Sequence, residues 1–275
     1  MIDVLGGGGV GLHVRRYGRQ GAPPVLFLHG WSQNHLSWRA QFESDLAESF
    51  DLVVMDLRGH GASQAPQGPE HYTNGDAWAQ DVHAVIETLG LVRPVLVGWS
   101  YGGLVVADYL RRYGDGAISG VNFVSASLVI GKEWLGTHTG PTFLEHASKG
   151  MSKDPVKALE GMIDFVHACA VKPIPQRDIE RAIAFNMLVR PDVRRALSAR
   201  TEDFRDVLAG LRTPALVTHG EADTVIMPQM AQDVLARHPD ATASWYPGVG
   251  HMPFMEEPER FNRELADFVR RVRGV

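Results

Sequence analysis

The chain has 275 residues, of which 44% are hydrophobic and 21% are charged, a composition typical of globular proteins rather than disordered or fibrous ones. Its formal net charge of −5 leaves no concentrated basic surface, so we expect no nucleic-acid partner and no binding to a membrane. Cys169 is the only cysteine, which excludes an intrachain disulfide. We find neither a signal-peptide pattern nor an apolar run of about 20 residues, and therefore predict a cytoplasmic protein.

A glycine cluster near the start of the sequence has the glycine spacing of a nucleotide-binding loop. Gly6, Gly8 and Gly11 have the spacing of a dinucleotide-binding motif. That loop functions only where it follows a strand and opens a helix, whereas this one leads into the alternating segment 10–17. We therefore predict a flexible turn, followed by an antiparallel strand at the edge of a sheet.

From residue 25 to residue 124, short apolar runs alternate with longer amphipathic stretches, the pattern of βαβ units on a parallel sheet. The runs are continuous because buried parallel strands are apolar on both faces. The pattern stops near residue 127 and resumes at residue 214. The predicted strands are 25–28, 52–55, 95–98, 121–124, 214–220 and 243–246, and the predicted helices are 36–48, 76–89, 102–113, 229–237 and one beginning at 258.

The stretch between the two parts of this pattern is mostly helical and is interrupted by prolines, which break or start helices. We predict an α/β fold with a mostly parallel central sheet flanked by helices and a helical cap inserted into it. The core domain is 1–127 and 206–275, and the cap is 128–205. Large apolar residues of the cap are expected mainly to pack against their own domain. They are Trp134, Phe143, Met151, Met162, Phe165 and Met187.

The strongest chemical signal is the segment Gly98-Trp99-Ser100-Tyr101-Gly102, which lies between a predicted strand and a predicted helix. A nucleophile elbow requires this context, because its sharp turn exposes the serine hydroxyl. The strand and helix then pass so close together that the flanking positions tolerate little beyond glycine. We therefore predict that Ser100 is a catalytic nucleophile.

A serine hydroxyl needs a base to take its proton and a third group to orient that base. His251 follows the last predicted strand, in a loop that can reach the carboxyl edge of the sheet. Asp223 follows the strand 214–220 and completes the chain order serine, acid, histidine. Glu221 is the alternative acid. His29, His60 and His219 are expected to make local hydrogen bonds instead.

Ester cleavage also needs donors aimed at the developing oxyanion. We assign this role to the backbone N–H groups of Tyr101, at the start of a helix, and of Trp31, in the loop after the strand 25–28. The side chains of Trp31, Trp99 and Tyr101 are candidates for the pocket lining, although each would also serve as core packing.

Together, His29-Gly30-Trp31, the segment from Asp56 to Ser63, the Ser100 turn and the loops of Asp223 and His251 resemble the α/β-hydrolase superfamily. The resemblance covers nearly the whole chain except the cap. The core is similar to esterases and cofactor-free haloperoxidases or perhydrolases, and also to epoxide hydrolases and haloalkane dehalogenases. The last two families use an aspartate nucleophile, which Ser100 argues against. Perhydrolase-type members tend to have a proline where this chain has Ser32, which favours hydrolysis.

The predicted function is cleavage of a carboxylic ester or lactone of a small, largely apolar substrate through an acyl-enzyme on Ser100. The alternatives are a C–C bond hydrolase, or a perhydrolase or cofactor-free haloperoxidase, on the same triad. A hydrolase-fold ligand receptor is the alternative outside enzymes. We expect no cofactor and no metal site. The expected partner is a small ester-like molecule, and a homodimer is a further possibility.

Overall fold

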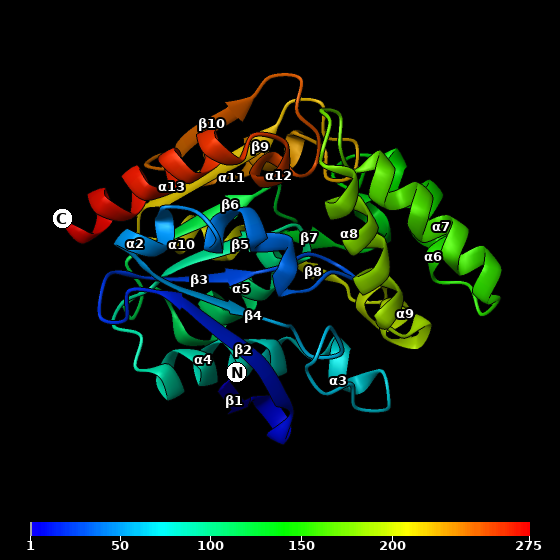
Figure 1. Cartoon of the computed structure of the whole chain (residues 1–275), viewed down its shortest axis with the longest axis horizontal. Coiled ribbons are helices and arrows are strands. Elements are labelled where there is room, and N and C mark those ends of the chain that lie inside the picture. Colours follow the sequence, from blue (N-terminus) through cyan, green and yellow to red (C-terminus); the bar gives the residue numbers. More distant parts are fainter. Residues whose placement is uncertain (1) are drawn as a thin grey trace.

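Eight strands form one central sheet in the computed structural model, which describes residues 2–275 (Figure 1). Their order across the sheet is β1-β2-β4-β3-β5-β6-β9-β10. The strands from β4 to β10 run parallel, whereas β1 and β2 pair antiparallel, so the mostly parallel α/β sheet predicted from the sequence is confirmed. The strands are β1 (Ile2–Leu5), β2 (Gly11–Gly18), β3 (Pro24–Leu28), β4 (Asp51–Met55), β5 (Val95–Trp99), β6 (Gly120–Val124), β9 (Ala215–Gly220) and β10 (Thr242–Tyr246).

The N-terminal strands correct one prediction. The segment 10–17 forms the antiparallel strand β2, but β1 pairs with its outer side and occupies the edge of the sheet. β1 has only four residues, too few to give a periodic signal. The glycine cluster forms a short 3-10 turn at Gly7–Gly9. Gly7 N donates to Asp81 at 2.9 Å and Gly7 O accepts from Arg58 at 2.9 Å, so the turn is anchored to the core.

Helices cover the two faces of the sheet. In one group, α5 packs against β5, α4 and α10, and α11 packs against α10 and β9. In the other group, α13 packs against β6, α1 and α12. The bounds are α1 (Arg39–Phe42), α2 (Leu46–Ser49), α3 (Glu70–Thr73), α4 (Gly75–Leu89), α5 (Tyr101–Tyr113), α10 (Arg205–Gly210), α11 (Gln229–Arg237), α12 (Pro253–Glu256) and α13 (Pro258–Arg273). None of the helices in residues 2–275 combines the length and the apolar character that a membrane crossing requires.

The helix predicted over 36–48 is broken into a 3-10 turn at His35–Trp38 and the short helices α1 and α2. Ser44 lies at the break. Its hydroxyl donates to Gln41 O at 2.7 Å and accepts from Leu46 N at 3.2 Å. A serine side chain that bonds nearby backbone groups competes with helix continuation, which explains the interruption.

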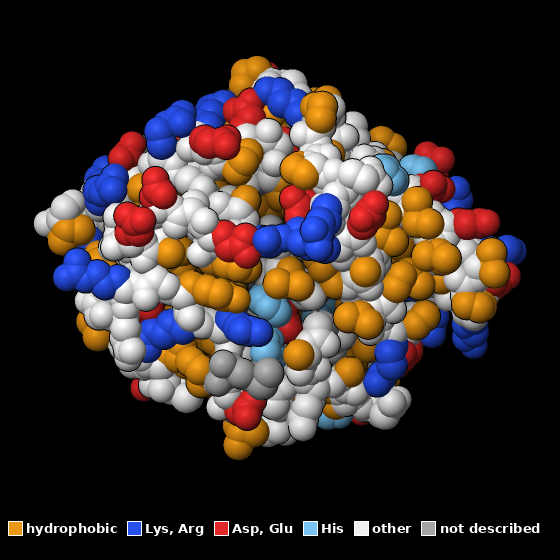
Figure 2. All heavy atoms as spheres, viewed as in Figure 1, with side chains coloured by type: hydrophobic (Ala, Val, Ile, Leu, Met, Phe, Trp, Pro, Cys, Tyr) orange, Lys and Arg blue, Asp and Glu red, His pale blue; other side chains and the backbone are white. Residues whose placement is uncertain are grey.

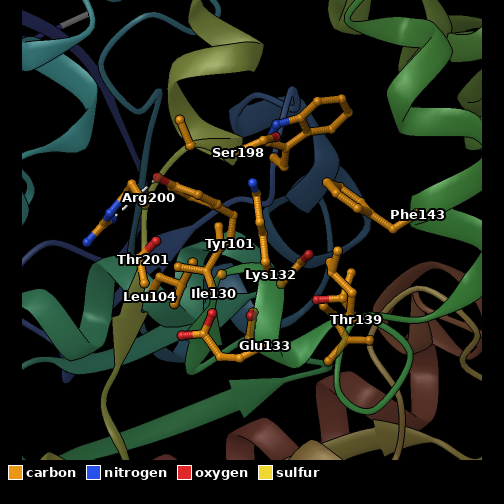
Figure 3. A pocket seen from close by; sticks show the side chains of 17 residues that line it. Tyr101, Leu104, Ile130, Lys132, Glu133, Thr139, Phe143, Ser198, Arg200 and Thr201 are labelled. Carbon is orange, nitrogen blue, oxygen red and sulfur yellow. Dashed lines mark hydrogen bonds between the residues drawn. The ribbon is translucent and has the colours of Figure 1, made fainter.

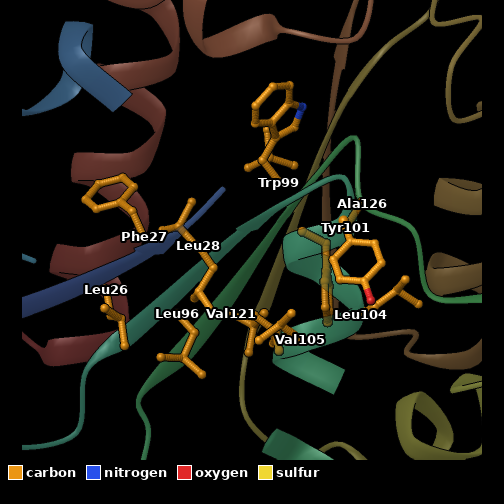
Figure 4. Packing of buried hydrophobic residues seen from close by; sticks show 14 of the residues in the cluster. Leu26, Phe27, Leu28, Leu96, Trp99, Tyr101, Leu104, Val105, Val121 and Ala126 are labelled. Carbon is orange, nitrogen blue, oxygen red and sulfur yellow. The ribbon is translucent and has the colours of Figure 1, made fainter. Parts of the chain in front are cut away.

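The core lies along the parallel strands, because every residue of β3, β4, β5, β6 and β9 is buried. Leu96 and Val121 are neighbours in register on β5 and β6, and they lie beside Val105 of α5 (Figure 4). Burial on both faces accounts for the unbroken apolar runs in the sequence. The packed strands hold the loops at their carboxyl ends in fixed positions.

The segment between β6 and β9 contributes the helices α6 (Ser148–Gly150), α7 (Pro155–Ala168), α8 (Gln176–Leu188) and α9 (Pro191–Ser198). Pro155 and Pro191 each open a helix, as expected of proline. The two-residue strands β7 (Val129–Ile130) and β8 (Glu202–Asp203) pair antiparallel at the two ends of the segment. The sequence did not predict them, because strands of this length carry no pattern. The boundaries 128–205 of a separate cap stay a prediction.

The helices α6 to α9 gather at one side of the sheet (Figure 1). Hydrophobic side chains are frequent on that side of the molecular surface, whereas acidic and basic side chains are interspersed over the rest of the face shown in Figure 2. Val156, Leu159 and Leu188 are exposed on α7 and α8. The rest of the face shown therefore has the mixed charge that the composition predicts.

Candidate active site

Ser100 occupies a sharp turn between β5 and α5, with φ 55° and ψ −119°. An L-residue adopts this conformation only when its surroundings enforce it. A Cβ on Gly98 would lie 2.8 Å from Gly102 O, and one on Gly102 would lie 2.4 Å from Leu28 O. The two glycines therefore allow the strand, the turn and the helix to pass each other at the distance the elbow needs.

The other predicted residues lie on loops that follow parallel strands. Trp31 follows β3, Asp223 follows β9 and His251 follows β10, just as Ser100 follows β5. Because the carboxyl ends of parallel strands meet at one edge of a sheet, these loops converge there. Trp99 Nε1 donates to His251 O at 2.9 Å, which ties the histidine loop to the residue before Ser100.

Asp223 and His251 are in direct contact, with 2.8 Å between Oδ2 and Nδ1, and both side chains are buried. Asp223 Oδ1 accepts the N–H groups of Val225 at 2.8 Å and of Ile226 at 3.1 Å, which fixes the carboxylate. Burial, the largest single influence, raises the pKa of Asp223, but the His251 and His219 rings and the Val225 N–H together outweigh it and hold the pKa below its ordinary value. The carboxylate is therefore ionised where it orients the imidazole.

The alternative acid, Glu221, is exposed in the turn. The carboxylate bonded to His251 is that of Asp223. The hydrogen bonds found within residues 2–275 include none between Ser100 Oγ and the His251 ring. Such catalytic hydrogen bonds are often long without substrate and tighten only when it binds.

Two backbone N–H groups near Ser100 have no acceptor within residues 2–275. Tyr101 is the first residue of α5, so its N–H has no acceptor in the helix. Trp31 N likewise donates no hydrogen bond to the described part of the chain. A Cβ built on the neighbouring Gly30 would lie 3.5 Å from Ser100 Oγ, which shows how closely this loop approaches the serine. The arrangement provides two unused donors for an anionic oxygen.

A carboxylate that no sequence motif indicates organises the histidine loop. The buried side chain of Glu256 accepts hydrogen bonds at 2.8 to 3.2 Å from four backbone N–H groups. The donors are those of Gly250, Met252, Val171 and Lys172. His251 N also donates to Cys169 O at 2.8 Å. The loop is thus held from both the core and the inserted segment, a contact that no local motif indicates.

A cavity of about 440 Å³ opens beside Ser100 (Figure 3). Trp31 and Tyr101 line it, as predicted, together with residues near both ends of the segment between β6 and β9. The predicted lining role of Trp99 is wrong. Its ring is buried against Trp38 and Phe254, and Figure 4 shows it pointing away from Tyr101. Trp99 ends β5 and Tyr101 begins α5, and only the second of these two side chains lines the cavity.

Much of the cavity lining is apolar. Apolar lining residues include Leu104, Ile130, Phe143 and Ile226. Of the large apolar residues singled out in the insertion, only Phe143 is in the lining, whereas Met162 and Phe165 belong to the buried core. The expectation that these residues mainly serve packing is therefore correct for most of them.

A buried charged group, Arg200, forms part of the cavity lining. Arg200 donates to Asp108 of α5 at 2.8 Å and to the hydroxyl of Tyr101 at 3.3 Å. Burial raises the pKa of Tyr101 to about 12, so its phenol is neutral at ordinary pH. Arg200 follows α9 and reaches the helix that begins beside Ser100, which joins the insertion to the elbow. A lone arginine in a polar stretch gave no sequence signal for this contact.

The three histidines that were expected to make local hydrogen bonds do so. His29 accepts from Leu57 N at 3.0 Å, His60 lies 2.9 Å from Arg58 O, and His219 lies 3.0 Å from Ile226 O.

The only group in residues 2–275 with side chains close enough to share a metal ion is His13, His35 and Asp56. Asp56 already accepts from His35 N, His35 Nδ1 and Ala62 N. These bonds give the carboxylate a structural role.

Comparison with known proteins supports the same fold. The profile of the alpha/beta hydrolase family matches residues 25–264. The chain is 28% identical to the bifunctional esterase/perhydrolase DCH of Acinetobacter calcoaceticus, over 95% of this chain and 97% of that protein. It is 26% identical to the non-heme haloperoxidase of Rhodococcus erythropolis, over 90% and 92% of the two chains. The crystal structure of the esterase RhEst1 from Rhodococcus sp. ECU1013 has a TM-score of 0.91 and 33% identity, with 98% of each chain covered. The chain therefore belongs to the α/β-hydrolase family, and the superfamily resemblance of its motifs is confirmed.

Proposed function

We propose that the protein is a serine hydrolase that cleaves carboxylic esters or lactones through an acyl-enzyme on Ser100. The observation that carries the proposal is the 2.8 Å contact between Asp223 Oδ2 and His251 Nδ1. It fixes the imidazole tautomer that leaves Nε2 free to accept a proton. Relatives named as esterases support the same reaction class.

In the proposed reaction, Ser100 Oγ attacks the ester carbonyl while His251 Nε2 takes the hydroxyl proton. The tetrahedral oxyanion is stabilised by the N–H groups of Trp31 and Tyr101, and the dipole of α5 adds to this stabilisation. His251 then gives its proton to the departing alcohol. In the second half, water attacks the acyl-enzyme, His251 accepts its proton, and Ser100 regains that proton as the acid leaves.

The cavity supports a small substrate with a substantial apolar part. Its volume of about 440 Å³ lies at the lower end of ligand pockets in general. Leu104, Phe143 and Ile226 provide apolar contacts. An acyl chain of modest length or a substituted lactone ring has matching size and polarity.

Ser32 argues against perhydrolysis as the main reaction. Its φ is 60°, whereas a proline ring fixes φ near −65°. The oxyanion loop therefore has a backbone path here that a proline at this position could not follow. Ser32 Oγ also accepts from Arg194 Nε at 2.9 Å, which ties the loop to α9.

The proposal is tested by the hydrolysis of a chain-length series of p-nitrophenyl esters, beside a panel of lactones. We expect turnover by the native chain and its loss in Ser100→Ala, with the circular dichroism spectrum unchanged. Undiminished turnover by pure, folded Ser100→Ala would exclude the assignment. Binding of these compounds without any turnover by the native chain would favour the ligand-receptor alternative.

A further inference from the structure

Lys132 places a positive charge at the cavity beside Ser100. It begins a 3-10 turn, Lys132–Trp134, that follows β7, and its side chain is exposed. Figure 3 shows it extending between Tyr101 and Phe143, two residues that also line the cavity. Within residues 2–275, its ammonium group has no hydrogen-bond or ion-pair partner.

The other charged residues of the lining are either bonded within the protein or point away from Lys132. Arg200 is buried and bonded to Asp108 and Tyr101, so its charge is compensated inside the protein. The Glu133 side chain folds back over the adjacent backbone. Its Oε2 lies 2.7 Å from the position that a Cβ on Gly131 would take. Its carboxylate forms no ion pair with Lys132 and points away from the ammonium group in Figure 3. Lys132 is therefore the one lining cation in residues 2–275 without a counter-charge.

We infer that the cavity accepts esters that carry a carboxylate away from the scissile bond, and that Lys132 binds this carboxylate. This inference rests on the proposed function and names its substrate class. The apolar lining residues Leu104, Phe143 and Ile226 contact the carbon chain, while Lys132 meets the charged end. The carboxylate is on either the acyl or the alcohol part, since both extend from the carbonyl bound at Ser100.

The experiment compares matched anionic and neutral substrates in two arms. The acyl arm pairs monomethyl glutarate with methyl pentanoate, and the alcohol arm pairs 4-acetoxybutanoate with butyl acetate. Steady-state hydrolysis is followed in a pH-stat. We expect the native chain to show a KM roughly twofold to fivefold lower for the anionic member of one arm, as suits a solvent-accessible ion pair. The preference should fall as salt is raised, because ions screen an exposed pair.

Three variants assign the preference to its residue. Lys132→Met keeps the apolar stem but removes the charge, and should raise KM for the anionic ester to that of its neutral partner. Lys132→Arg should retain the preference, since the charge is kept. Lys153→Gln is the matched control, because this exposed lysine of the insertion is outside the cavity lining and should behave as native.

Two results would overturn the inference. One is equal KM values for anionic and neutral esters in both arms with the native chain. The other is an anionic preference that persists in Lys132→Met. Either result leaves Ser100-dependent hydrolysis of neutral esters intact, and so is distinct from failure of the proposed function, in which the neutral esters are not hydrolysed.

Discussion

Asp223 and Glu221 are two carboxylates in one turn with different surroundings. Asp223 is buried, bonded to His251 and held by two backbone N–H groups. Glu221 is exposed to solvent. The proposed mechanism uses only the first, because an orienting group must touch the ring that it orients.

Asp223→Asn should therefore lower kcat for ester hydrolysis by about 10⁴-fold, since an amide at this position favours the wrong imidazole tautomer. Glu221→Gln, in the same turn, should leave kcat within about twofold of the native value, because surface substitutions away from the site change little. Both are measured with a p-nitrophenyl ester. A large loss in Glu221→Gln with a native rate in Asp223→Asn would reverse the assignment of the acid.

For single residues, the sequence was sufficient to predict the candidate triad, because each of its members is in a loop directly after a recognisable strand. It was insufficient for Lys132, Arg200 and Glu256. The roles of Arg200 and Glu256 depend on contacts between distant parts of the chain, such as Arg200 with Asp108 and Glu256 with Val171. Lys132 lies in a lining whose residues come together only in the folded chain. Trp99 was misplaced because periodicity does not tell which side of a strained turn a side chain takes.

Among the elements, the elbow depends on the close approach of β5, α5 and β3. Gly102 is the tightest point, with 2.4 Å between its would-be Cβ and Leu28 O. Because backbone atoms move less readily than a flexible side chain, an added methyl group must displace the helix from the strand. The position of Ser100 then changes with it.

Gly102→Ala should lower the free energy of unfolding by about 1 to 3 kcal/mol, the range for overpacking, and should reduce ester hydrolysis. Gly116→Ala is the control, because a Cβ there meets no atom within 4 Å. That variant should change stability by less than about 0.5 kcal/mol. Urea unfolding of both variants gives the comparison, and equal stability of the two would show that the elbow tolerates a side chain.

The predicted elements were accurate where one periodic pattern continued, as for α4, α5 and α11. They were wrong where side chains competed with the backbone, as Ser44 does between α1 and α2. They also failed for β1, β7 and β8, whose short runs form strands only because a partner strand lies beside them. Pairing of this kind is a tertiary effect that local sequence does not contain.

For the whole molecule, buried histidines behind the active-site loop link stability to pH. Burial lowers the pKa of His29 to about 3 and that of His60 to about 4, from an ordinary value of 6.5. The unfolded chain therefore takes up protons on both rings as pH falls below 6.5, whereas the folded chain stays neutral there. Because the unfolded state binds more protons, the free energy of unfolding decreases as pH is lowered through this window.

We expect the free energy of unfolding to decrease by up to about 4 kcal/mol between about pH 7.5 and about pH 5 from these two groups. Replacing His60 with Gln should make that decrease smaller, since one of the two rings is gone. Urea unfolding at several pH values measures the slope. A stability that stays constant over this range would contradict the neutral, buried state of both rings.

The segment between β6 and β9 is held to the rest of the fold by contacts at its two ends. β7 pairs with β8, Phe204 N donates to Leu128 O at 3.0 Å, and Arg200 bonds to Asp108 of the core. These contacts set the cavity between the insertion and the elbow. In the proposed function, the core supplies the reacting residues, while the inserted segment brings Lys132 and Phe143 to the cavity.

Covalent labelling with a fluorophosphonate tests whether Ser100 is an activated nucleophile. We expect one phosphonate adduct on the Ser100 peptide, located by mass spectrometry, with loss of ester hydrolysis in proportion to labelling. Ser100→Ala should take up no label. Absence of labelling in the active native chain, or an adduct on another residue that accounts for the lost activity, would contradict the claim.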